Sequence, residues 1–218
     1  SLYRATEARF EEILAPYCKD GLARAELFQT EMRNLGSYGY GIKSFGLSMI
    51  ETAIRLSAGR VQGDEIGQII ELIQGMVRTP VQLLEGVAEV VPELAAQHRL
   101  MLVTKGDLLD QERKLAGSGL ATYFCQIEIV SQKTAEVYRR LLTQHQIAPQ
   151  RFLMVGNSLR SDVLPVVELG GHAVHIPYHV TWAHEMIDLP EETPRGYVEL
   201  ADIKCLPGYV SQLQGGMS

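Results

Sequence analysis

The stretch RFLMVGNSLRSDVLPVVELGG, residues 151–171, decides how the whole chain is interpreted. Its apolar residues 152–155 are followed by the small polar sequence Gly156-Asn157-Ser158, and a helix-like pattern begins at Asp162. In open parallel sheets, ligands bind at the carboxyl ends of the strands. A strand that ends in glycine, small polar groups and an acid therefore predicts a charged ligand at its tip.

The same alternation of strand and helix extends through the second half of the chain. Apolar runs predict strands at residues 100–103, 125–129, 152–155 and 173–176, with a further short strand near 197–200. Helical patterns at 87–97, 107–116, 134–144 and 162–169 separate them, and a terminal helix follows Cys205. This order is typical of βαβ units, so we expect residues 79–218 to form a Rossmann-like α/β domain with a parallel sheet.

Residues 1–78 have a different pattern. Apolar residues recur there with helical spacing, and glycine-rich breaks such as LGSYGYG, residues 35–41, divide the segment into four expected helices. Asp64 is the candidate N-cap of the fourth helix. We expect an all-helical domain over residues 1–78.

Composition narrows the classes of partner. The chain has 218 residues, of which 46% are hydrophobic and 21% charged, as in a soluble globular protein. A formal net charge of -6 and the absence of a run of Lys or Arg argue against nucleic acid and against an anionic membrane surface. No apolar run approaches the ~20 residues that span a bilayer. Three scattered cysteines without a CxxC pair fit a reducing cytoplasm, and Cys125 is expected to be buried in its strand.

Three strand tips carry groups suited to phosphate and metal. The strand at 100–103 leads into Thr104-Lys105-Gly106, a hydroxyl and glycine-region N–H groups that are suited to phosphate oxygens. Lys133 lies near a helix N-terminus, where the helix dipole repels an ammonium group unless an anion lies between them. Asn157, Ser158 and Asp162 offer the hard oxygen ligands that Mg²⁺ prefers. These groups suit phosphoryl transfer, but a nucleophile is missing from the set.

Taken together, these motifs resemble those of the haloacid dehalogenase superfamily. The resemblance covers residues 79–177 in order and spacing, and the helical segment before them resembles the four-helix cap of that superfamily. It rests on Leu84-Glu85-Gly86-Val87, Leu102-Val103-Thr104-Lys105-Gly106, Lys133 with Tyr138 and Leu141, Val155-Gly156-Asn157-Ser158, Asp162, and Gly170-Gly171.

The resemblance implies roles for individual residues. Thr104 resembles the Ser/Thr that hydrogen-bonds the transferring phosphoryl group, and Lys133 resembles the lysine that steadies the nucleophile and the phosphate. Asp162, with Asn157, resembles the acidic Mg²⁺ motif, and Lys105 and Gly106 are the expected substrate-binding neighbours of Thr104. The implied protein is a Mg²⁺-dependent phosphatase of a small phosphorylated metabolite.

Two departures from the family pattern are clear. Asn157 stands where most members have Asp or Glu, so a weaker hold on Mg²⁺ is expected. The family motif DxDxT, which supplies the aspartate that becomes phosphorylated, does not occur in these residues. In relatives it ends the first strand, just before the first cap helix. We therefore expect a segment upstream of Ser1 that adds a strand to the middle of the sheet.

Two alternatives and several candidate contacts stay open. A metal-independent 2-haloacid dehalogenase uses the same scaffold, and a non-catalytic binding or regulatory member would explain both departures. Oligomeric state, a homodimer included, is not settled by the sequence. Tyr38 and Tyr40 are candidate substrate contacts. His179, Trp182, His184 and Glu185 are candidate pocket residues, but Pro177 between His175 and His179 argues against a metal pair.

Overall fold

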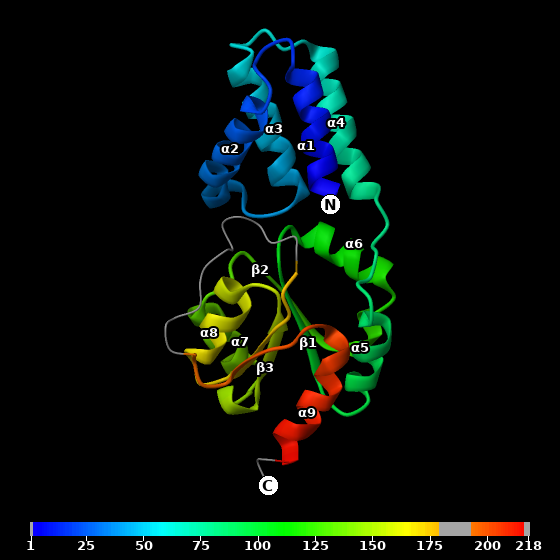
Figure 1. Ribbon diagram of the computed structural model, residues 1–218, viewed down its shortest axis with the longest axis vertical. Helices are drawn as coiled ribbons and strands as arrows, with labels where there is room; N and C mark the ends of the chain where they lie inside the picture. Colours follow the sequence, from blue (N-terminus) through cyan, green and yellow to red (C-terminus); the bar gives the residue numbers. More distant parts are fainter. Residues whose placement is uncertain (1, 179–192, 216–218) are drawn as a thin grey trace. The chain divides into compact units, whose positions relative to one another are not determined.

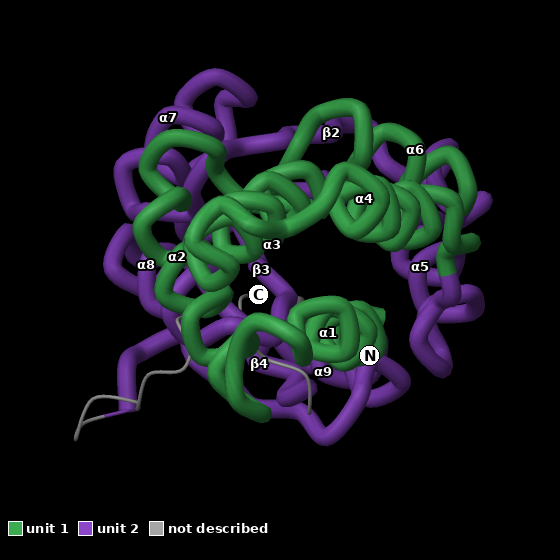
Figure 2. Tube along the Cα trace, turned by 90° about the horizontal axis from the view of Figure 1, so that it is seen from above, with its two compact units in different colours: residues 1–81, 105–117 green, residues 82–104, 118–218 purple. Residues whose placement is uncertain are grey.

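The computed structural model describes residues 2–178 and 193–215, which form two compact units. One unit comprises Ser1–Val81 and Lys105–Gly117, and the other comprises Gln82–Thr104 and Ser118–Ser218 (Figure 2). The chain first passes from the one unit to the other after Val81, three residues beyond the boundary expected at residue 78. The segment Lys105–Gly117 groups with the helical unit instead of the α/β unit, which the sequence did not predict.

The helical unit contains the four expected helices. They are α1 (Leu2–Leu14), α2 (Leu22–Tyr38), α3 (Ile42–Leu56) and α4 (Gly63–Arg78), and α6 (Leu108–Ser118) belongs to the same unit except for its last residue. The predicted cap of α4 was wrong: Gln62 is the N-cap, and the Glu65 side chain accepts a hydrogen bond from the Gln62 N–H at 2.7 Å. Asp64 lies inside the first turn, where its negative charge interacts favourably with the positive end of the helix dipole.

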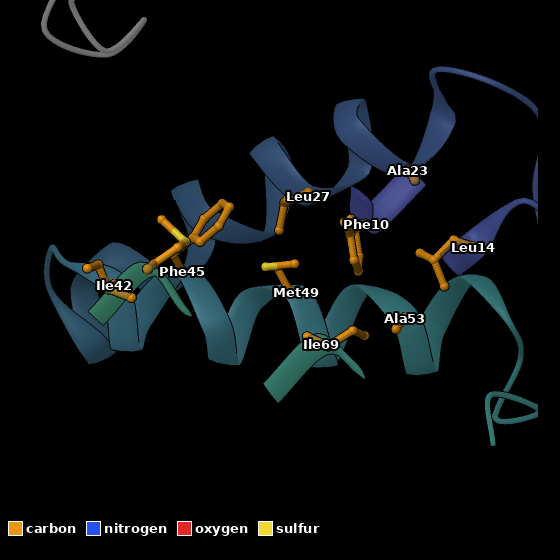
Figure 3. Close-up of a cluster of buried hydrophobic side chains, with 10 residues drawn as sticks. Phe10, Leu14, Ala23, Leu27, Ile42, Phe45, Met49, Ala53 and Ile69 are labelled. Carbon is orange, nitrogen blue, oxygen red and sulfur yellow. The ribbon is translucent and has the colours of Figure 1, made fainter. Parts of the chain in front are cut away.

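Helices α1 to α4 enclose one apolar core. Phe10, Leu27, Met49 and Ile69 are almost fully buried and point toward one another between the helices (Figure 3). Each such side chain stabilises the fold by about 1.5–3 kcal/mol relative to its exposed state. The helical spacing in the sequence therefore identified the core-facing residues of this unit.

The α/β unit places helices on both faces of its strands. The strands are β1 (Leu100–Lys105), β2 (Phe124–Val130), β3 (Leu153–Gly156), β4 (His172–His175) and β5 (Tyr197–Glu199) (Figure 1). The helices that pack on them are α5 (Val87–Ala95), α7 (Ala135–Gln144), α8 (Leu164–Val167) and α9 (Leu206–Gly215). Met154 of β3 packs in a cluster with residues of α7 and α8, whereas its neighbours Leu153 and Val155 pack in a cluster with residues of α5 and α9. This alternation marks β3 as a strand buried on both faces.

The described strands form two separate ladders instead of the single sheet expected. Strands β3, β4 and β5 pair in parallel, with Gly156 opposite His175 and His175 opposite Glu199. Strands β1 and β2 pair with each other. Val103 of β1 and Met154 of β3 nevertheless belong to one buried cluster, so both ladders share a core.

Two further sequence expectations have clear outcomes. Cys125 is exposed on β2, not buried, and its Sγ donates a hydrogen bond to the Leu100 carbonyl at 3.1 Å. Within residues 2–178 and 193–215, every helix is too short or too polar to cross a bilayer. The candidate pocket residues 179, 182, 184 and 185 lie outside the described part of the chain.

Candidate functional site

The tip of β3 opens into a tight turn that carries Asp162. The helix expected to start at residue 162 is instead a π-helical turn, Leu159–Val163, followed by the short α8. The Val163 N–H donates to the Ser158 carbonyl at 3.3 Å, which is the wider i→i+5 spacing of a π-turn. The Ser158 hydroxyl caps the turn by accepting from the Ser161 N–H at 3.0 Å. Such turns are rare and are often found at functional sites.

Gly156 leaves room for the Asp162 carboxyl group. A Cβ atom at residue 156 would lie 2.2 Å from Oδ2 of Asp162, well inside van der Waals contact. The same Oδ2 accepts a hydrogen bond from the Ser158 N–H at 3.0 Å. The glycine that ends the strand is therefore required by the close approach of the carboxyl group to the main chain.

Lys133 pairs with Asp162. Its Nζ lies 2.7 Å from Oδ1 of Asp162, and the side chains are only 12% and 6% exposed, respectively. Lys133 directly precedes Thr134, the N-cap of α7, whose hydroxyl accepts from the Val137 N–H. The ammonium group of Lys133 lies near the positive end of α7, and the carboxylate of Asp162 supplies the negative charge that offsets this repulsion. Because the pair is buried, loss of either partner costs on the order of 3–5 kcal/mol.

Two side chains that sequence reasoning did not place at the site contact its backbone. The Tyr138 hydroxyl, on α7, donates to the Ser161 carbonyl at 3.1 Å. Burial and then the charge of Asp162 raise the pKa of Tyr138 above its ordinary value, so the hydroxyl stays protonated. Nε2 of His175, on β4, lies 3.1 Å from the Asn157 carbonyl oxygen. His175 lies opposite Gly156 in the parallel pairing of β3 and β4, a register that the sequence pattern does not specify.

Nδ1 of His175 faces Glu199. Its distance to Oε2 of Glu199 is 3.0 Å, and the Tyr197 hydroxyl donates to the same oxygen at 3.1 Å. The contact with His175 lowers the pKa of Glu199 below its ordinary value. Contacts therefore run from Glu199 on β5, through His175 on β4, to the Asn157 carbonyl in the turn after β3.

The predicted phosphate-binding residues lie at the end of β1. Thr104 is partly buried in the α/β unit that also contains Lys133 and Asp162. Lys105 and Gly106 group with the helical unit, where Nζ of Lys105 lies 4.5 Å from the centroid of the Tyr40 ring. Gly106 has φ 139°, a conformation that favours glycine. That Thr104 acts together with Lys133 stays a prediction.

The donors at the β3 tip fit Mg²⁺ in type. Asn157 is exposed, and its amide oxygen and the Asp162 carboxylate are the hard ligands that Mg²⁺ prefers. Among the described residues there is no cluster of three or more Asp, Glu, His or Cys side chains suited to a metal ion. Mg²⁺ bound here would therefore take its remaining ligands from water, from a substrate phosphate, or from residues outside the described ranges.

Comparisons with known proteins agree on the family. The profile described as "Haloacid dehalogenase-like hydrolase" matches residues 31–165. The crystal structure of a haloacid dehalogenase-like family hydrolase from Xanthomonas campestris is 39% identical, with a TM-score of 0.85 over 99% of this chain and 85% of that one. The chain therefore belongs to the haloacid dehalogenase-like hydrolases.

More distant structures share the fold alone. A 2-haloacid dehalogenase from Pseudomonas syringae is 18% identical, with a TM-score of 0.64 over 97% of this chain and 91% of that one. The putative HAD-hydrolase YfnB from Bacillus subtilis, bound to magnesium, is 16% identical, with a TM-score of 0.61 over 95% of this chain and 92% of that one. No curated protein sequence matches the chain significantly. Membership of the family rests on the profile match over residues 31–165 and on the 39% identical structure.

Proposed function

We propose that the protein is a Mg²⁺-dependent phosphatase that acts on a small phosphorylated metabolite. The observation that carries the proposal is the buried Lys133–Asp162 pair, 2.7 Å apart, beside the exposed Asn157 at the carboxyl end of β3. A cation and oxygen ligands at one strand tip suit a reaction that depends mainly on positioning and on neutralising phosphate charge.

Each side chain has a defined task in this proposal. Thr104 donates a hydrogen bond to the transferring phosphoryl group, while Lys133 holds the nucleophile and a phosphate oxygen. Lys105 and the Gly106 N–H bind the substrate next to Thr104. Asn157 and Asp162 hold Mg²⁺, which supplies positive charge to the phosphate when it is bound. Because Asn157 is neutral, the metal is held less firmly than by two carboxylates.

In this proposal the nucleophile is the aspartate of the family motif DxDxT, which does not occur among residues 1–218. One carboxylate oxygen attacks phosphorus in line, the bond to the substrate oxygen breaks, and the neighbouring acid protonates the leaving alkoxide. Water then hydrolyses the aspartyl-phosphate and releases inorganic phosphate. In this proposal the helical unit determines which substrate is accepted.

The test is an assay of the full-length gene product with an aryl phosphate. We expect Mg²⁺-dependent phosphate release that stops in excess EDTA and is abolished by Lys133→Ala. Lys114→Ala is the matched control, because Lys114 also pairs, at 2.8 Å, with an aspartate side chain that is 6% exposed. Turnover that persists in EDTA, or in Lys133→Ala, would overturn the proposal.

A metal-independent 2-haloacid dehalogenase is the second candidate. This candidate is favoured because Asn157 is neutral and Asp162 is the one carboxylate of the motif. Since Lys133 already neutralises Asp162, little negative charge is left to bind a metal ion. Release of halide from a 2-haloacid in the presence of EDTA, without phosphate release, would establish this alternative. An upstream segment without any aspartate pair would instead identify a non-catalytic binding or regulatory member.

A further inference from the structure

We infer that Tyr138 and His175 are positioning residues that hold both ends of the Asn157–Asp162 turn and thereby set its affinity for Mg²⁺. The inference rests on the metal role proposed for that turn. Neither side chain is within the turn: Tyr138 comes from α7 and His175 from β4. Each bonds a main-chain carbonyl oxygen, so neither bond occupies the oxygen atoms that would face the metal.

The C-terminal end of the turn is held by Tyr138. A π-turn is wider than an α-helical turn and is less stable without outside support. The Tyr138 ring is 1% exposed, and its hydroxyl donates to the carbonyl of Ser161, the residue before Asp162. Loss of this hydroxyl would remove the donor that α7 supplies to the Ser161 carbonyl, and the turn would gain freedom next to the Asp162 carboxylate.

The N-terminal end is held by His175. Because a carbonyl oxygen only accepts, the 3.1 Å contact requires a proton on Nε2 of His175, which donates to the Asn157 carbonyl. Glu199 contacts the other ring nitrogen at 3.0 Å and fixes the orientation of the ring. The His175 side chain is 11% exposed, so its ring is largely shielded from water.

The two hydrogen bonds to the turn fix how Asn157 and Asp162 are oriented relative to each other. Asn157 and Asp162 present their oxygen atoms from a short turn, and a small movement at either end changes the angle between the two groups. Partners that orient metal-binding groups in this way are typically worth about 10- to 100-fold in metal affinity. We therefore expect the two hydrogen bonds to matter for Mg²⁺ more than for the stability of the fold.

The experiment uses four variants of the full-length protein. Tyr138→Phe and His175→Leu remove the two hydrogen bonds to the turn. Tyr17→Phe is the first matched control, because it removes a tyrosine hydroxyl that bonds Glu65 at 2.6 Å in the helical unit. His145→Leu is the second, because that side chain is also 11% exposed and contacts a glutamate, Glu128, at 2.6 Å.

Calorimetric titration with Mg²⁺ and amide hydrogen exchange supply the two readouts. We expect Tyr138→Phe and His175→Leu to raise the Kd for Mg²⁺ by about 10-fold or more and to speed exchange at the amides of residues 158–163. Both controls keep the wild-type Kd and the wild-type exchange in that segment. The kcat of Tyr138→Phe should recover when Mg²⁺ is raised, which a general loss of stability would not produce.

Each outcome decides the inference. Equal Kd values for the two turn variants and their controls overturn it, even where the melting temperature falls. A wild-type protein that gives no Mg²⁺ binding overturns the metal role in the proposed function instead. That result also overturns the role of Tyr138 and His175 in Mg²⁺ affinity, and hydrogen exchange then decides alone whether they hold the turn: faster exchange in residues 158–163 supports this part of the inference, and unchanged exchange overturns it.

Discussion

Replacing Gly156 by alanine tests the geometry of the site most sharply among single substitutions. The new methyl group would lie 2.2 Å from Oδ2 and 2.3 Å from Cγ of Asp162, whereas ordinary contacts begin at 3.4 Å. The carboxyl group must therefore retreat by about 1 Å, which lengthens its bonds to Lys133 and to the Ser158 N–H. Crowding of this kind costs about 1–3 kcal/mol.

Two measurements follow from this displacement. For a protein of this size, differential scanning calorimetry should show a melting temperature lower by about 3–10 °C. A misplacement of about 1 Å at the reacting groups should lower kcat by roughly 10²-fold. Gly67→Ala is the control, because a Cβ there meets open space inside α4, and alanine should stabilise a helix by about 0.5–1 kcal/mol. A Gly156→Ala variant that melts and turns over like Gly67→Ala would refute the reasoning.

The remaining predictions concern metal affinity and pH. Asn157→Asp adds a charged ligand and should lower the Kd for Mg²⁺ by about 10-fold in calorimetric titration; an unchanged Kd would show that residue 157 does not bind the metal. Burial, then the charge of Glu7, raises the pKa of Glu31 from 4.5 to about 7. The folded state therefore holds this proton more tightly than the unfolded state, and stability declines as pH rises from 4.5 to 7, by up to about 3 kcal/mol. Glu31→Gln should consequently gain melting temperature relative to wild type between pH 5 and pH 8; a difference that is the same at both pH values would contradict the assignment.

Local patterns were sufficient to predict the elements and part of the site. Helical spacing identified α1 to α4, and short apolar runs located β1 to β5 to within a few residues. The position of Lys133 near a helix N-terminus called for an anion, and Asp162 supplies it. The elements could be predicted because they depend on neighbours in the sequence, whereas ligand binding at the strand tips stays a prediction.

Other features depend on tertiary packing that local pattern does not encode. An ordinary helix was predicted from residue 162, so the π-turn at residues 159–163, which begins three residues earlier, was missed; one wide turn leaves the apolar spacing almost unchanged. The hydrogen bonds of Tyr138 and His175 join residues 23 and 18 positions apart, respectively, and end on backbone atoms, which a motif does not reveal. The grouping of Lys105 with the helical unit likewise follows from contacts such as that with Tyr40.

The most direct test of the central claim is a crystal structure of the full-length protein with Mg²⁺ and inorganic phosphate. The proposed function predicts the metal ion against the Asn157 amide oxygen and the Asp162 carboxylate, with the phosphate reached by Thr104 and Lys133. A phosphate bound away from Lys133, or a Thr104 hydroxyl remote from the Lys133–Asp162 pair, would contradict it.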